Sequence, residues 1–147
     1  MDIERRRHIE QDCRDLITAL VHHYDHGAAE QAADLFVPDG LWVKSQVPYR
    51  GREAIIGSFA AQPASLVLRH FTSNILVNVH DEQNASAVTY YLAFVGRRDE
   101  TRPDAEIPLE LPGSLGEWND TFVATADGWR FARREGRRIF GRRAAAR

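Results

Sequence analysis

The sequence predicts an α+β fold, with three helices followed by an antiparallel sheet. Up to residue 60, apolar residues recur at helical spacing in three segments. From Leu66 onward, extended stretches are rich in β-branched and aromatic residues. Helices that precede a run of strands are typical of α+β domains, in which the helices cover one face of the sheet. We therefore expect one domain spanning residues 1–147.

Three N-terminal helices are expected, at residues 3–25, 28–36 and 52–60. The first has an apolar face with three- and four-residue spacing, made of Ile9, Cys13, Leu16, Ile17, Leu20, Val21 and Tyr24. Gly27 is a suitable C-terminal cap because glycine readily adopts positive φ. The PDG motif at 38–40 indicates a turn, after which a strand begins at Leu41.

Four extended stretches follow, at residues 66–79, 85–95, 116–125 and 129–138. HDEQN at 80–84 and ADG at 126–128 are turn signals between them. The segment 97–114 contains three prolines and many charges, so we expect a long loop, which in compact domains is functional or disordered. Residues 141–147 are expected to form a disordered tail.

Composition narrows the class of protein. The 147 residues are 44% hydrophobic and 27% charged, as in soluble globular domains, and no apolar run approaches the 18 residues of a membrane span. Cys13 is the only cysteine, which excludes an internal disulfide and favours a cytoplasmic location.

The last 15 residues hold seven arginines, but Glu135 and apolar residues interrupt them and the net charge is −2. A solvated edge strand is therefore expected there, and neither a nucleic acid nor a membrane partner.

Asp25 is the most informative residue of the HHYDHG stretch at 22–27. It follows Val21 by four residues, so it projects near the apolar face of the first helix. It also lies in the last helical turn, where the helix dipole disfavours a negative charge. A residue that breaks two local rules is a candidate functional residue. The alternative is that the helix frays early and leaves Asp25 in solvent.

His70 is the candidate partner of Asp25. It begins a strand in which His70, Thr72, Asn74 and Leu76 would share one face. A buried Asp–His pair has a clear use, because the carboxylate fixes the imidazole tautomer and leaves the other ring nitrogen as a base. The alternative is a strand histidine with a purely structural hydrogen bond.

His22, His23 and His26 are expected to be surface and cap residues, since a histidine near a helix C-terminus is favourable on dipole grounds alone. His22 and His26 have the spacing of a metal pair, but no glutamate or third ligand accompanies them. No metal and no cofactor is expected.

The order of several short motifs resembles the SnoaL-like branch of the nuclear transport factor 2-like superfamily. They are a helix ending in Tyr-Asp, LFxxDGxW at 35–42, YxGRxAI at 49–55, RHxxxN at 69–74, two adjacent tyrosines at 90–91, and DGWRF at 127–131. The resemblance covers about residues 5–140. It implies a cone, in which a strongly bent antiparallel sheet and three helices enclose a pocket.

The resemblance also implies site residues. In the scytalone dehydratase and hexachlorocyclohexane dehydrochlorinase branch, an aspartate at the end of the first helix pairs with a strand histidine, which matches Asp25 and His70. Tyr24 and Asp25 together match the Tyr-Asp pair at the end of the dehydratase's first helix. The dehydratase's second histidine falls near Gly96, and its serine and asparagine fall near Gly116 and Trp118, so these groups are missing. The dehydrochlorinase's arginine falls near Ala126, so it is missing too. We therefore expect a related proton-transfer reaction on another substrate, and neither of these two known activities.

The expected function is a cofactor-independent acid–base enzyme: a lyase or dehydratase, an isomerase or a polyketide cyclase. His70 would remove a proton, Asp25 would orient it, and Tyr24 or a water would donate to a leaving hydroxyl or an enolate. The substrate would be a small hydrophobic, cyclic molecule. From strand alternation and the resemblance, we expect the substrate to contact Trp42, Lys44, Phe59, Asn74, Tyr91, Trp118 and Asn119. Either Asn119 or Asp120 should face inward. The alternative for Lys44 is a solvated strand lysine.

Two other classes of function stay open. The chain could be a structural subunit, like the small subunits of ring-hydroxylating dioxygenases, or a module that binds a hydrophobic ligand without converting it. The superfamily commonly dimerises through the outer face of the sheet, so a homodimer is expected, with a trimer as the alternative.

Overall fold

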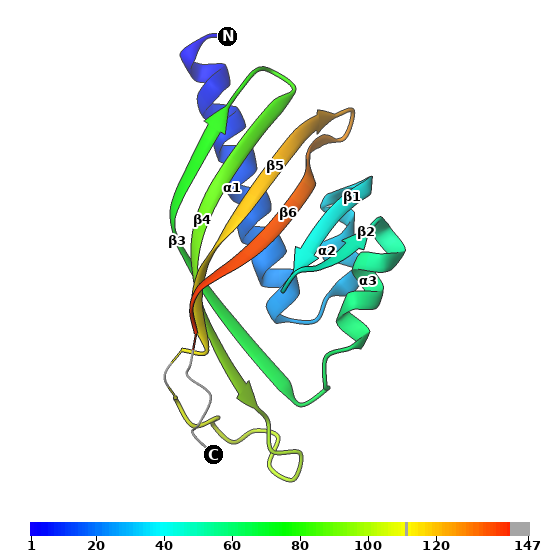
Figure 1. Cartoon of the computed structure of the whole chain (residues 1–147), viewed down its shortest axis with the longest axis vertical. Helices are drawn as coiled ribbons and strands as arrows, with labels where there is room; N and C mark the ends of the chain where they lie inside the picture. Colours follow the sequence, from blue (N-terminus) through cyan, green and yellow to red (C-terminus); the bar gives the residue numbers. More distant parts are fainter. Residues whose placement is uncertain (111, 142–147) are drawn as a thin grey trace.

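The computed structural model, which describes residues 1–110 and 112–141, confirms the α+β fold. Three helices accompany one six-stranded sheet (Figure 1). The elements are α1 (Ile3–Asp25), α2 (Ala29–Asp34), β1 (Phe36–Lys44), β2 (Val47–Arg50), α3 (Arg52–Ala60), β3 (Leu66–Val79), β4 (Asn84–Arg97), β5 (Ser114–Thr125) and β6 (Gly128–Gly141).

The sheet is mixed, and this corrects the expectation of a purely antiparallel one. Its strand order is β2-β1-β6-β5-β4-β3, and β1 pairs with β6 in parallel while every other neighbouring pair is antiparallel. Local patterns indicate hairpins between consecutive strands, whereas the first strand, β1, and the last strand, β6, meet only through the tertiary fold. The chain order therefore could not reveal the parallel pair.

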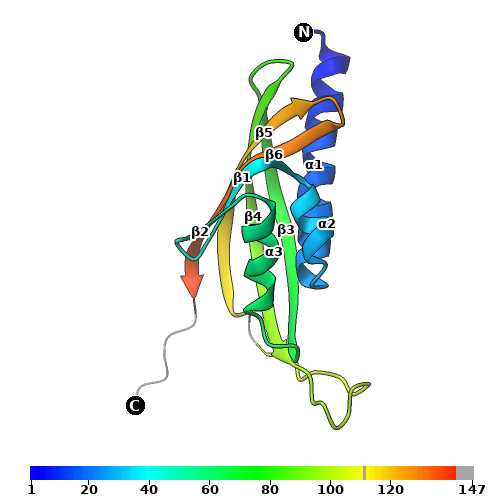
Figure 2. The same ribbon diagram turned by 90° about the vertical axis from the view of Figure 1, so that its right-hand side faces the viewer.

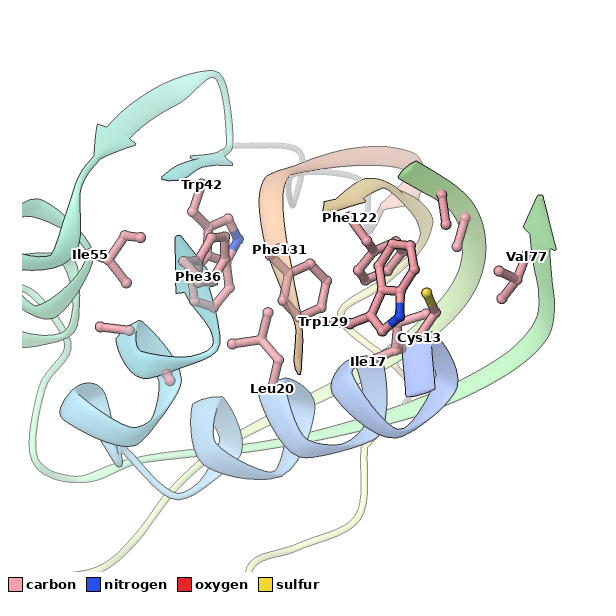
Figure 3. Close-up of a cluster of buried hydrophobic side chains, with 14 of the residues drawn as sticks. Cys13, Ile17, Leu20, Phe36, Trp42, Ile55, Val77, Phe122, Trp129 and Phe131 are labelled. Atoms are coloured by element: carbon pink, nitrogen blue, oxygen red, sulfur yellow. The ribbon is translucent and has the colours of Figure 1, made fainter. Parts of the chain in front are cut away.

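Helix α1 lies along one face of the four long strands, and α2 and α3 lie beside the short strands β1 and β2 (Figures 1 and 2). The apolar face of α1 is fully buried at Ile9, Cys13, Ile17 and Leu20. These side chains pack against an aromatic layer from the sheet, shown in Figure 3, which includes Phe122, Trp129 and Phe131. Each such side chain stabilises the fold by about 1.5–3 kcal/mol when fully buried, so this layer fixes α1 on the sheet.

Three irregularities in the strands could not be read from the sequence. The PDG motif lies inside β1, at a register shift between Phe36 and Leu41, and does not precede the strand. Ser45 and Gln46 form the two-residue turn from β1 to β2 with φ values of 48° and 70°, a geometry that usually selects asparagine or glycine. The turn therefore carries no sequence signal and holds the backbone in a strained conformation beside Lys44.

The third irregularity is a bulge in β3 between Ser73 and Leu76, where Asn74 has a φ of 51°. One inserted residue reverses the alternation of the faces. His70 and Thr72 share a face with Val77 and Val79, while Asn74 and Leu76 are exposed. The expectation that Asn74 and Leu76 share the face of His70 is therefore wrong.

The predicted long loop lies between the end of β4 at Arg97 and the start of β5 at Ser114. Strand β6 includes Gly141, so the expected disordered tail does not begin there, and its remainder, 142–147, lies outside the described residues. None of the helices in the described part of the chain is both long and apolar enough to cross a membrane.

Substitutions at two glycines, Gly116 in β5 and Gly57 in α3, test how closely the sheet is packed. A Cβ on Gly116 would lie 2.3 Å from the Arg137 carbonyl oxygen and 2.6 Å from the Tyr91 hydroxyl, whereas a Cβ on Gly57, within α3, would meet nothing within 4 Å. Because the neighbouring backbone cannot yield, we expect Gly116→Ala to lower the free energy of unfolding by about 1–3 kcal/mol. Gly57→Ala should leave it unchanged or raise it by up to ~1 kcal/mol. Urea denaturation measures both, and equal effects would contradict this packing.

Candidate functional site

The end of α1 places Asp25 against the sheet. Gly27 adopts a φ of 68°, as expected of a cap, and the Ala28 amide donates to the His23 carbonyl at 2.9 Å. The helix therefore stops directly after Asp25 instead of fraying before it. The Asp25 side chain is only 6% exposed, and this excludes the solvated alternative.

Asp25 binds His70 twice. One carboxylate oxygen accepts from His70 Nδ1 at 2.5 Å, and the other accepts from the His70 backbone amide at 2.7 Å. The His70 side chain is 9% exposed. In a neutral imidazole, this contact to an ionised Asp25 selects the tautomer with the proton on Nδ1, and the lone pair is then on Nε2. Among the described residues, no group forms a hydrogen bond with Nε2.

Aromatic rings fix the imidazole from three sides. The ring centroids of Trp118, Tyr24 and Tyr91 lie 5.5, 5.7 and 5.9 Å from that of His70. Trp118 and Tyr91 are stacked on each other at 4.6 Å. The carboxylate sets the tautomer, and the rings limit the rotation of the imidazole.

The Tyr24 hydroxyl can act as a hydrogen-bond donor. It accepts a hydrogen bond from the Gln62 amide nitrogen at 3.0 Å, which leaves its own proton free. Burial raises the pKa of Tyr24 above its usual value of 10, and the negative charge of Asp25 adds to this effect. The phenol therefore stays protonated at neutral pH.

His70 lines a cavity of about 810 Å³. Its wall is aromatic at Tyr24, Trp42, Tyr91 and Trp118, and it includes the charged residues Lys44, Glu135, Arg137 and Arg138. Such a volume accommodates a small organic molecule. The wall combines aromatic surface with charge, which a purely hydrophobic ligand would not need.

Lys44 places a positive charge among aromatic rings at the wall of the cavity, which is an unusual environment for a lysine. Its ammonium donates to the Ser58 hydroxyl at 2.7 Å and lies over the rings of Trp42, Phe59 and Tyr24 at 3.9, 4.4 and 4.5 Å from their centroids. No carboxylate of the described residues forms an ion pair with it. Burial lowers the pKa of Lys44 to about 7 because the ammonium loses its hydration. The alternative of a solvated strand lysine is excluded.

Asp120 and Arg134 form a buried ion pair against the ring of Trp118, and no sequence pattern predicts it. Arg134 donates two hydrogen bonds of 2.7 Å to Asp120, and both side chains are at most 1% exposed. The guanidinium lies over the Trp118 ring at 4.5 Å from its centroid. It thus supports the indole that contacts His70. No sequence pattern marks Arg134 as the buried residue of this arginine-rich run. A bulge in β6 between its pairings with Thr121 and Phe122 turns Arg134 inward.

The structure brings together most of the expected contact residues. Trp42, Lys44, Tyr91, Trp118 and Asn119 all line the cavity. Asp120, and not Asn119, is the inward buried member of its pair, since Asn119 is largely exposed.

Two expected contacts lie elsewhere. Phe59 lines a smaller cavity of about 360 Å³ on the other side of Tyr24, whose ring it meets edge-on at 5.4 Å. Asn74 lines neither cavity, because the β3 bulge turns it to the outer face.

The three histidines near Asp25 take no part in the pair. The His26 ring bonds the His22 carbonyl at 2.7 Å, and the rings of His22 and His26 lie 4.3 Å apart. Within residues 1–110 and 112–141, no three histidine, cysteine, aspartate or glutamate side chains gather as a metal site would require.

The lowered pKa of Lys44 predicts a pH-dependent stability. Below pH 7 the ammonium is charged in both states, and the folded state bears its lost hydration. Between about pH 7 and the ordinary value of 10.5, the unfolded chain binds the proton and the folded protein does not, so stability rises with pH. Relative to Lys44→Met, the wild type should gain up to ~1.4 kcal/mol per pH unit over this window. Urea titrations of both proteins at pH 6 to 9 measure the difference, and a difference independent of pH would contradict it.

Known structures share this architecture over nearly the whole chain. A candidate scytalone dehydratase from Novosphingobium aromaticivorans DSM 12444 is 22% identical, with a TM-score of 0.80 over 99% of this chain and 94% of that one. A type 2 hexachlorocyclohexane dehydrochlorinase is 11% identical, with a TM-score of 0.78 over 99% and 95%. A candidate aromatic ring hydroxylase from Novosphingobium aromaticivorans is 19% identical, with a TM-score of 0.73 over 95% and 92%. At these identities the similarity establishes the fold.

No functionally curated protein matches the chain. The sequence pattern of the SnoaL-like domain matches residues 5–135, most of the chain. Together with the fold of its structural neighbours, this match shows that the protein belongs to the SnoaL-like domain family.

Proposed function

We propose that the protein is a cofactor-independent acid–base enzyme of the lyase or isomerase type, in which His70 removes a proton from carbon. The observation that carries the proposal is the double hydrogen bond from His70 to Asp25, with Nε2 left unbonded at the wall of a ligand-sized cavity. Such a pair has the parts of a general base: an imidazole of fixed tautomer and a carboxylate that stabilises the imidazolium formed on proton transfer.

The neighbouring groups suit a carbon acid. His70 Nε2 takes the proton next to an electron-withdrawing group, and Asp25 stabilises the resulting positive charge. The Tyr24 hydroxyl donates to the enolate oxygen or to a leaving hydroxyl, since its second hydrogen-bonding position is already filled by Gln62. Elimination, isomerisation or cyclisation follows from the same first step, depending on the substrate.

The lining favours a small cyclic substrate. Tyr91 and Trp118 present a stacked aromatic surface beside His70, and Lys44 places a polar group at the wall. Solved neighbours include the candidate dehydratase and the dehydrochlorinase, whose names denote eliminations, and this supports the lyase branch of the proposal.

Hydrogen exchange of a carbon acid tests the base without knowledge of the substrate. The protein is incubated in D₂O with 2-tetralone, whose activated carbon exchanges measurably, and loss of the proton signal is followed by NMR. We expect the wild type to accelerate exchange, and His70→Asn to lose this acceleration by a factor on the order of 10² to 10⁴. Asp25→Asn should lose a comparable factor, because it removes the charge that stabilises the imidazolium.

The matched control is His26→Asn, which changes an exposed histidine one residue from Asp25 and should keep the wild-type rate. Thermal unfolding of each variant separates loss of the base from loss of the fold. Long-range ¹H–¹⁵N spectra of the wild type should show His70 protonated at Nδ1. Exchange that survives His70→Asn in a folded variant would refute the proposal, and ligand binding without exchange would favour a binding module.

We also propose that two copies pair through the outer face of the sheet. Phe71, Leu76 and Tyr90 are 64%, 61% and 47% exposed, and strand alternation directs them away from α1. Clustered apolar residues of this kind mark contact surfaces. We expect a dimeric mass by light scattering, and Phe71→Glu should shift it to the monomer without unfolding. A monomeric wild type would contradict this pairing.

A further inference from the structure

Lys44 is the only lysine in the chain. The sequence has 19 lysines and arginines, and all the others are arginines, including those at its surface. The one lysine lies at the wall of the main cavity. An arginine stays protonated at any physiological pH, whereas a lysine can release its proton and become a nucleophile. The one cationic side chain that can release its proton therefore lines the cavity, alongside Arg137 and Arg138.

The surroundings of Lys44 leave its amine available. Ser58 is its only hydrogen-bonding partner among the described residues, and Ser58 in turn donates to the Ile55 carbonyl at 2.6 Å. The remaining neighbours are aromatic faces. A surface lysine would be hydrated, and a structural buried lysine would be paired with a carboxylate. Lys44 is neither, and its nitrogen keeps positions free for a ligand.

Lys44 and His70 flank the same ring. The Lys44 nitrogen lies 4.5 Å from the centre of the Tyr24 ring, and the imidazole centroid lies 5.7 Å from it. Both residues line the same cavity. One small molecule can therefore meet the amine and the imidazole together. The strained Ser45–Gln46 turn immediately follows Lys44 and fixes the end of β1.

We propose that Lys44 is a nucleophilic amine that forms a Schiff base with a ketone or aldehyde bound in this cavity. The nitrogen lone pair attacks the carbonyl carbon, and the carbonyl oxygen takes up the proton that the nitrogen loses. The hydroxyl of the carbinolamine so formed takes up a proton from the solvent and leaves as water, while the nitrogen lone pair forms the C=N bond. The product is a protonated iminium. This step needs no oxidant, reductant or cofactor.

The inference deepens the proposed function and, for the step that follows, rests on it. The iminium withdraws electrons from the neighbouring carbon, and His70 then removes the proton from that carbon to give an enamine. The substrate class is thereby narrowed to carbonyl compounds with a hydrogen on the adjacent carbon. Formation of the Schiff base itself does not require His70.

Two properties of the site favour this chemistry. With a pKa of about 7, roughly half of the Lys44 amine is neutral at neutral pH, whereas an ordinary lysine is almost wholly protonated. The iminium is again a cation, so the rings of Trp42, Phe59 and Tyr24 stabilise it as they stabilise the ammonium. The same pocket thus accepts the amine before and after the bond forms.

Reductive trapping tests the proposal on the full chain. The protein is incubated at pH 7 with sodium cyanoborohydride and one of two carbonyl probes, formaldehyde or 2-tetralone, and adducts are located by intact mass and peptide mapping. The only other amine is the α-amino group, whose ordinary pKa of about 8 makes it an internal control. At pH 7 about half of the Lys44 amine and about a tenth of the α-amino group are neutral, so we expect Lys44 to be labelled at least about fivefold faster.

Variants separate the two proposals. Lys44→Arg keeps the charge but should lose the labelling at this position, whereas His26→Asn, at an exposed position outside this cavity, should be labelled as fast as the wild type. Labelling of Lys44 no faster than the α-amino group with both probes would overturn the Schiff base, because formaldehyde is small enough to enter any cavity. If hydrogen exchange persists in that case, His70 remains the base and Lys44 is a hydrogen-bond donor only. If Lys44 is labelled but exchange is absent, the acid–base proposal fails and the Schiff base stands.

Discussion

The double hydrogen bond between Asp25 and His70 is the constraint on which the site depends. It joins the last residue of α1 to the early part of β3, 45 residues later, through both the backbone and the ring of one histidine. The dipole at the C-terminal end of a helix disfavours a carboxylate, and burial adds to that cost. The two donors from His70 offset it. The bond thus fixes the helix end on the sheet and, with it, the orientation of the imidazole.

Polar groups elsewhere in the interior follow the same rule. Asp120 is fully buried, which raises its pKa, and the two hydrogen bonds from Arg134 act in the opposite direction. Removing one partner of such a pair leaves a buried charge and is expected to cost about 3–5 kcal/mol. The pair supports Trp118, which contacts His70. Lys44 is the exception, because aromatic faces and one hydroxyl surround it and no carboxylate in the described part of the chain balances it.

Local sequence patterns predict much of the secondary structure. The first helix was expected at residues 3–25 and the third at 52–60, and both have these bounds, because apolar spacing and the Gly27 cap act within the helix itself. The long strands β3 to β6 were placed within a few residues by their β-branched and aromatic content. The β1–β2 hairpin was missed because its turn is Ser45-Gln46, which lacks the usual glycine or asparagine.

The sequence by itself determined the helices and the long strands. It also made Asp25 and His70 candidate partners, because a carboxylate near the apolar face at a helix C-terminus is unfavourable unless it is paired. The tertiary structure alone decided the parallel contact of β1 with β6, the outward turn of Asn74 at a bulge, and the inward turn of Arg134. It also decided that Lys44 is half-buried, with its ammonium over aromatic rings. The physical reason is one of range: periodicity and caps act between residues a few positions apart, whereas strand pairing, bulges and side-chain burial depend on segments that only folding brings together.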